Sequence, residues 1–116
     1  MTDLTVAVPA ANGQGAAQTG EPGWYTVACY APATGGDWDS GTVTLQVNYA
    51  PSDPVWITAV DWQGDNVAFA AANGIQQIAY GGTPQFRASL AGSSGATVVT
   101  CKLFRGKAMT REEDWY

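Results

Sequence analysis

Apolar and polar residues alternate over short stretches along much of the chain. The clearest stretch is 41–49, where one face of an extended strand is apolar and the other is polar. The apolar face consists of Val43, Leu45, Val47 and Tyr49. This alternation predicts a strand with one face in a core and one in water, as in an antiparallel sheet.

The stretch 55–62 has a different pattern, because it is apolar on both sides. Trp56, Val60 and Trp62 share one face of an extended chain, and Val55, Ile57 and Ala59 share the other. A 116-residue domain has little material with which to cover a second face of a sheet. We therefore predict that the outer side of this stretch meets another subunit, through Trp56 and Trp62.

Stretches of this kind recur about every ten residues, and none has helical periodicity. The predicted strands cover residues 4–8, 24–31, 41–49, 55–62, 67–71, 74–80, 84–92 and 96–105, with a further short strand within 14–19. Turn residues separate them, as at Asn73-Gly74. The spacing predicts an all-β fold: a single antiparallel β-sandwich, jelly-roll-like, over residues 1–105.

Residues 106–116, GKAMTREEDWY, differ in kind from the rest of the chain. They hold a third of its charged residues and include two aromatic ones, Trp115 and Tyr116. We predict a short extended tail that leaves the sandwich and is held either by its own domain or by a partner.

Composition narrows the classes of partner. Charged residues make up only 13% of the chain, which predicts a surface of Thr, Ser, Gln and Asn rather than Lys and Glu. The net charge is −5, and five basic residues cannot form a broad phosphate-binding face, so direct nucleic-acid binding is not expected. The sequence shows neither a secretory signal nor an apolar run of membrane-helix length, so no membrane partner is expected either.

Cys29 and Cys101 are the two cysteines of the chain. Without a secretory signal the compartment of synthesis is expected to be reducing, which favours free thiols. Both residues fall on apolar faces of predicted strands and are expected to act as small core residues. A disulfide between neighbouring strands stays open as the alternative.

Candidates for catalytic chemistry are few. The sequence has no His, which removes the most common general base and most transition-metal ligand sets. Paired carboxylates can serve a glycosidase, and Asp37 with Asp39 would be the pair for a calcium site. The acidic candidates are Asp37, Asp39, Asp53, Asp61 and Asp65. Since Asp side chains commonly cap backbone N–H groups at turns, we predict such structural roles for Asp37, Asp39, Asp53 and Asp65. Asp61 lies inside the apolar stretch 55–62, and we expect it to be solvated at a strand end. We expect no enzyme activity, no cofactor and no metal.

The five tryptophans are the other candidates for function. Exposed indole rings can stack on sugars, for which Trp38, Trp56 or Trp62 would serve, but Trp is also enriched in cores and protein interfaces. We favour core and interface roles. The predicted interface residues are Leu4, Val6, Trp38, Trp56, Trp62, Trp115 and Tyr116.

Four motifs in residues 11–105 resemble a recurrent pattern in small virion-associated β proteins of tailed bacteriophages. They are Pro22-Gly23-Trp24-Tyr25, the run from Gly41 to Gln46, Val55-Trp56-Ile57 and Phe86-Arg87-Ala88. These motifs are architectural, so the resemblance carries fold better than role, and it supplies no catalytic residues.

The resemblance implies a structural protein of the virion. Within that class we favour a capsid cement or decoration protein on the outer head surface, assembled in the host cytoplasm. Its partners would be the major capsid protein and copies of itself, as a dimer or trimer. A tail, tail-fibre or adaptor component is the first alternative, and a carbohydrate-binding β-sandwich module is the second.

Overall fold

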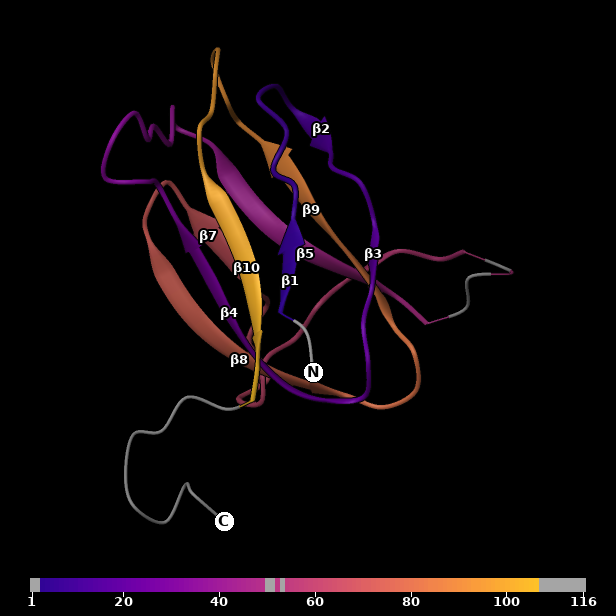
Figure 1. Ribbon diagram of the computed structural model, residues 1–116. Helices are drawn as coiled ribbons and strands as arrows, with labels where there is room; N and C mark the ends of the chain where they lie inside the picture. The colour runs from indigo at the N-terminus through magenta and orange to yellow at the C-terminus, as the bar shows by residue number, and fades with distance from the viewer. Residues whose placement is uncertain (1–2, 50–51, 53, 107–116) are drawn as a thin grey trace, which may run out of the picture.

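The computed structural model describes residues 3–49, 52 and 54–106. This part of the chain contains no helix and folds into two antiparallel sheets that pack face to face (Figure 1). The predicted all-β class and the sandwich-like packing of two sheets are confirmed.

The first sheet has four strands in the order β1-β10-β4-β8. Their bounds are Leu4–Val6 for β1, Gly23–Tyr30 for β4, Gly74–Tyr80 for β8 and Thr100–Arg105 for β10. The first and last of the ten strands thus lie side by side, and the middle of the chain forms the opposite edge of the sheet.

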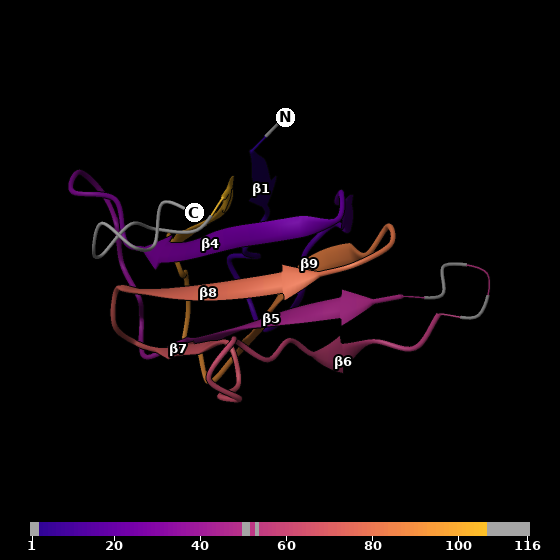
Figure 2. The ribbon, with the colours of Figure 1, turned by 90° about the horizontal axis from the view of Figure 1, so that it is seen from below.

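The second sheet is built around β9 and β5, which pair over seven residues. Its main path runs β2-β9-β5-β6, while β3 also pairs with β9 and β7 with β5. The bounds are Gly13–Gln14 for β2, Gln18–Thr19 for β3, Thr42–Asn48 for β5, Ile57–Thr58 for β6, Ala68–Ala70 for β7 and Gln85–Ala91 for β9. In the view from below, β6 and β7 follow one another along the outer side of β5 (Figure 2).

The core lies between the sheets and follows the alternation in the sequence. Val43, Leu45 and Val47 of β5 are fully buried, as predicted, and Phe86, Ala88 and Leu90 of β9 are buried beside them. Phe86 meets the ring of Tyr25 from the first sheet edge-on, with 5.4 Å between the ring centroids. Inward residues from both sheets therefore form one continuous hydrophobic cluster.

The end of the 41–49 stretch differs from the prediction. Tyr49 was expected on the inner face, but half of its surface is exposed, whereas Asn48 is buried. The side-chain amide of Asn48 donates a hydrogen bond of 3.3 Å to Oε1 of Gln85, the residue opposite it on β9. A buried amide is tolerated where it is hydrogen-bonded. The alternation of buried apolar and exposed polar residues therefore stops one residue before the end of the 41–49 stretch.

The predicted strand at 55–62 is also shorter than expected. Only β6 pairs with β5 as a strand. Ala59 then donates a backbone hydrogen bond to the carbonyl of Leu45, and Val60 forms an isolated antiparallel bridge with Asn66 outside the sheet. The chain makes a turn over residues 61–66 and returns at Val67, whose N–H donates to the carbonyl of Ala59. The apolar stretch is therefore a short edge strand followed by a turn that projects from the sheet.

Cys29 and Cys101 lie opposite one another on β4 and β10, and both are buried free thiols. This confirms the prediction that they are free, small core residues. Their hydrogen bond and their burial raise the pKa of Cys29, so it stays protonated near neutral pH.

The described chain ends at Gly106, which stays attached to the first sheet. Its N–H donates to the carbonyl of Trp24 at 2.7 Å. Residues 107–116, which are the predicted tail of 106–116 without Gly106 and include Trp115 and Tyr116, lie outside the described residues, so the tail stays a prediction.

Candidate functional site

The carboxylate of Asp39 fastens one loop to another. It accepts hydrogen bonds from the hydroxyls of Ser93 (3.0 Å) and Ser94 (2.9 Å) and from the N–H of Gly95. The bonds from Ser94 and Ser93 hold the pKa of Asp39 below its ordinary value of 3.8. Asp37 caps the same loop, since its Oδ1 accepts from the N–H of Asp39 at 2.9 Å.

Asp61 organises the turn that follows β6. Its Oδ1 accepts from the N–H groups of Gln63 and Asp65, and its Oδ2 accepts from Nε2 of Gln76, each at 2.9 Å. Burial alone would raise the pKa of Asp61, but the hydrogen bonds from Gln76 and from the turn outweigh it and lower the pKa. The carboxylate of Asp39 thus stabilises a loop, as the turn interpretation predicts. Asp61 was expected to be solvated at the end of a strand, but the chain turns there and its carboxylate caps the turn.

Among the residues that the structure describes, no three Cys, Asp or Glu side chains come close enough to hold a metal ion. Asp37 and Asp39 are joined through the hydrogen bond from the N–H of Asp39 to Oδ1 of Asp37. Asp53 lies outside the described residues. The described residues also include no helix that is long and apolar enough to cross a bilayer.

The most distinctive surface feature is a group of exposed apolar side chains along the outer side of β5. We call this group the edge surface; its members and exposed fractions are Tyr49 (50%), Val55 (62%), Ile57 (51%), Val60 (43%) and Trp62 (63%). Large apolar side chains that are exposed together on a small domain often mark an interaction site.

Strand pairing explains how part of the edge surface forms. Ile57 lies opposite Val47, so both point to the inner face of the second sheet. Val47 is fully buried but Ile57 is half exposed, which means that the first sheet covers β5 but not β6. An apolar residue that faces inward is thus left in contact with solvent.

Two tyrosines join the edge surface to the core. The rings of Tyr49 and Tyr80 lie 5.3 Å apart, and Tyr80 in turn meets Phe86 at 5.8 Å. The hydroxyl of Tyr80 accepts a hydrogen bond of 3.2 Å from the N–H of Val60. Burial raises the pKa of Tyr49 and of Tyr80, so both remain neutral phenols near neutral pH.

Trp62 stands at the free edge of the first sheet. Its backbone N–H donates to the carbonyl of Gln77 on β8 at 3.1 Å, and Gln76 binds both Asp61 and the carbonyl of Asn66. The turn over residues 61–66 therefore lies against the middle of β8 and blocks this edge from pairing with another strand. The indole side chain itself remains exposed.

The other predicted interface residues have contacts within the domain. Val6 is fully buried opposite Cys101, so its prediction as a surface contact is wrong, because β1 turns this face into the core. Leu4 is partly buried against the same core. Trp38 also packs there, and its Nε1 donates to Oδ1 of Asn73 at 2.8 Å. Trp115 and Tyr116 fall outside the described residues.

Trp56 lies apart from Trp62, on the outer face of the second sheet. The guanidinium carbon of Arg87 is 4.2 Å from the centroid of its ring, and Nε of Arg87 donates to Oε1 of Gln46 at 2.6 Å. A cation over an aromatic face is a favourable contact, so Trp56 is half-buried by its own domain. Trp62 is consequently the better candidate for contact with a partner.

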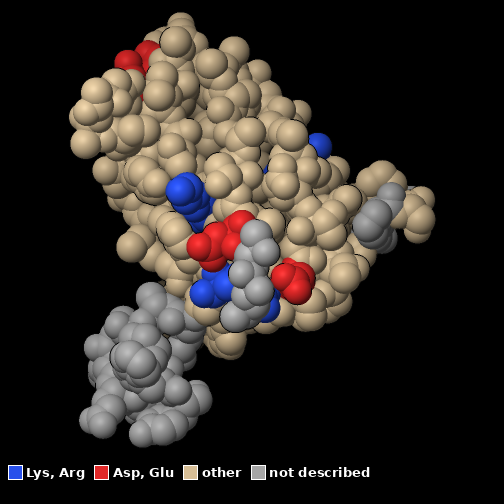
Figure 3. All heavy atoms as spheres, viewed as in Figure 1, with Lys and Arg blue, Asp and Glu red and all other residues tan. Residues whose placement is uncertain are grey.

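Val55, Ile57, Val60 and Tyr49 were not among the predicted interface residues. The sequence signal for Val55, Ile57 and Val60 is that 55–62 is apolar on both sides, whereas the predicted contacts in this stretch were limited to its tryptophans. Charged side chains are sparse over much of the face shown in Figure 3. Most of its red and blue atoms lie near the middle of the view.

No protein-family model, curated protein or solved structure matches this chain.

Proposed function

We propose that this chain is a non-enzymatic structural protein of a tailed-bacteriophage virion. Within that class it acts as a capsid cement or decoration protein that binds the outer head surface and bridges capsid subunits. Its partners are the major capsid protein and further copies of itself. The observation that carries the proposal is the edge surface, in which five large apolar side chains remain exposed.

The order of the strands supports this class. Counting β2 with β3, and β6 with β7, as interrupted single strands turns the ten strands into eight. Numbered along the chain, these eight run 1-8-3-6 in one sheet and 2-7-4-5 in the other. We propose that this is a jelly roll, an architecture that recurs in viral capsid proteins and in lectins.

Subunit contact is the role that best suits the chemistry of the edge surface. Its aromatic and branched aliphatic side chains are typical of the centre of protein interfaces, where charged residues are depleted. The turn over residues 61–66 covers the edge of β8, so strand addition at that edge is disfavoured, and we propose side-chain packing by the edge surface as the mode of contact.

Substitution of the edge surface tests the proposal. With purified phage heads that lack this protein, Trp62→Asp and Ile57→Asp should each weaken binding by about 2 kcal/mol or more, ~30-fold in Kd, as expected for central interface residues. Both side chains are exposed, so the variants should fold. Ala68→Asp, at an exposed position on β7, is the control and should bind as wild type does.

The proposal fails if the edge variants bind heads as tightly as wild type, or if heads burst at the same temperature with and without the protein. Electron microscopy of the intact particle, with copy number from quantitative mass spectrometry, separates the alternatives. A repeated position over the head lattice supports the cement role, and density only at the tail would identify a tail component.

The exposure of Trp62 also supports a second candidate function, which is that of a carbohydrate-binding module. A flat, exposed indole ring can stack on a sugar, and jelly rolls recur in lectins. Binding on a glycan array that is lost in Trp62→Ala, without any association with heads, would favour this candidate.

A further inference from the structure

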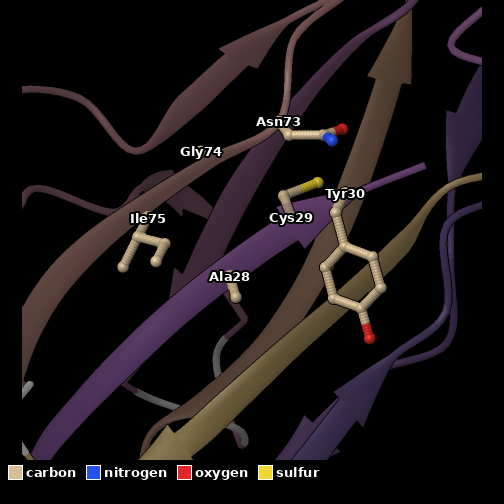
Figure 4. Close-up of a pocket in the computed structure, with 6 residues that line it drawn as sticks. All are labelled: Ala28, Cys29, Tyr30, Asn73, Gly74 and Ile75. Carbon is tan, nitrogen blue, oxygen red and sulfur yellow. The ribbon is translucent and has the colours of Figure 1, made fainter. Parts of the chain in front are cut away.

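The outer face of the first sheet carries a shallow apolar depression that is separate from the edge surface. It has a volume of about 380 Å³ and lies between the end of β4 and the start of β8. Its lining residues are Ala28, Cys29, Tyr30, Asn73, Gly74 and Ile75 (Figure 4). Ala28, Tyr30 and Ile75 point to the outer side of the sheet, whereas the sulfur of Cys29 points the opposite way.

Ile75 makes the depression unusual. Its side chain is 67% exposed, the largest fraction among the exposed large hydrophobic residues. Ile is among the residue types most often buried, so an Ile side chain this exposed on the face of a sheet is unusual. The volume of the depression falls within the range of small-ligand pockets, so it can take one large aromatic side chain.

The chain itself supplies a segment that begins on this face. Thr26, whose side chain shares the outer face with Ala28, donates from its Oγ1 to the carbonyl of Gly106 at 3.1 Å. The chain has therefore turned toward the outer face where the described part ends. Gly106 has a φ of +97°, a left-handed conformation that suits a change of direction and favours glycine.

Length allows the segment to reach the depression. Gly106 is bonded to Trp24, and Ala28 lies four residues further along β4, which is about 14 Å in a strand. From Gly106 to Trp115 the chain can extend about 30 Å, so a few residues are available for the reversal.

Charge also matches. Lys102 lies directly opposite Ala28 on the same face, and no ion pair to it occurs among residues 3–49, 52 and 54–106. In the sequence, Glu112-Glu113-Asp114 immediately precedes Trp115. An indole in the depression would bring these carboxylates near Lys102.

We propose that residues 107–116 fold back over the outer face of the first sheet of the same molecule, with the ring of Trp115 in the depression. Docking covers Ile75 and places the acidic run beside Lys102. This inference does not depend on the virion role, since it concerns contacts within one chain.

Quenching of a bimane label by tryptophan tests the proposal in the full chain. Thr100→Cys places the label opposite Tyr30, beside the depression, while the native thiols are buried and do not compete for the label. Trp115→Phe should abolish the quenching. Ile75→Asp, which keeps the quencher but makes the depression polar, should abolish it too, and Lys102→Glu should reduce it. A label at Ala68→Cys on the second sheet is the control and should not respond.

Three results would overturn the proposal. One is fluorescence unchanged by Trp115→Phe; another is a response to Trp115→Phe but none to Ile75→Asp, which would put the tail elsewhere. The third is evidence that the tail docks on a second molecule. In that case the quenching of the labelled chain with Trp115 would disappear on dilution, and a labelled Trp115→Phe chain would become quenched when unlabelled wild type is added. Since Ile75 is largely exposed, Ile75→Asp should fold, and its near-ultraviolet circular dichroism checks this.

Discussion

At the scale of single residues, Asp39 shows how this protein uses its few charges. The loop that contains it has a positive φ at Asp39 (48°) and at Ser40 (60°), a conformation that most side chains disfavour. Hydrogen bonds from Ser93, Ser94 and Gly95 compensate for the strain and hold the loop against the turn before β10. The carboxylate therefore acts as a loop fastener.

This role predicts a pH dependence. The folded pKa of Asp39 lies below its ordinary value of 3.8, so the unfolded chain takes up the proton first as the pH falls. The stabilisation is complete at neutral pH and is lost as the pH falls through 3.8 toward the lower folded pKa. Asp39→Asn should lower the urea midpoint at neutral pH, and the difference from wild type should shrink in acid.

Glu21→Gln is the control for the loss of charge, since the hydrogen bonds described for Glu21 involve its backbone. It should leave the urea midpoint at neutral pH nearly unchanged. A constant difference between Asp39→Asn and wild type over the whole pH range would contradict the assignment.

At the scale of elements, the turn over residues 61–66 protects a strand edge. β8 pairs with β4 on one side only, and the unpaired edge of such a strand can recruit other chains. The backbone N–H of Trp62 donates a hydrogen bond to the carbonyl of Gln77 in the middle of that edge. The carboxylate of Asp61 accepts a hydrogen bond from Nε2 of Gln76 and so attaches the turn to β8. A stretch that reads in the sequence as an apolar strand thus serves as an edge cover.

Asp61→Ala should loosen this cover. It removes the acceptor for Gln63, Asp65 and Gln76, and we expect a loss of about 1 kcal/mol in stability because the group lies near the surface. The freed edge of β8 should also increase self-association, measured by light scattering during incubation below the unfolding temperature.

Asp65→Ala is the matched control. It removes the same charge from the same turn, where Asp65 accepts a hydrogen bond from Asp61 through its backbone carbonyl. If both variants associate equally, charge rather than edge protection is responsible.

At the scale of the whole molecule, the two sheets share one core, and both cysteines are buried in it. Cys29 and Cys101 are buried on adjacent strands of the first sheet. Because only the thiolate form of a cysteine attacks a thiol reagent, the raised pKa of Cys29 adds to its protection. Reaction of either thiol requires the sandwich to open.

A thiol reagent should therefore report global unfolding. We expect the native thiols to react at least ~10³-fold more slowly than in urea-unfolded protein, as the marginal stability of a small domain implies. Thr34→Cys, at an exposed turn, should add one thiol that reacts at the unfolded rate. Native thiols that react as fast as Cys introduced at position 34 would show that the core is open.

Much of the fold could be predicted from the sequence, because alternation with a period of two is a local property. The strand at 74–80 is found with the predicted bounds, and the inward faces of β5 and β9 are as expected. The short strands β2 and β3 fall at or next to the predicted stretch 14–19. The candidate site was predicted less well: Trp62 is exposed, but Val6 is in the core and Trp56 is stacked under Arg87.

The sequence by itself determined where most of the strands lie and which face of the central strands is apolar. Only the tertiary structure decided which apolar faces are covered. β6 and β5 carry similar inward residues, yet Val47 is buried and Ile57 is exposed, since the first sheet covers one strand and not the other. Burial depends on contacts between segments far apart in the chain, and a local pattern carries no information about them.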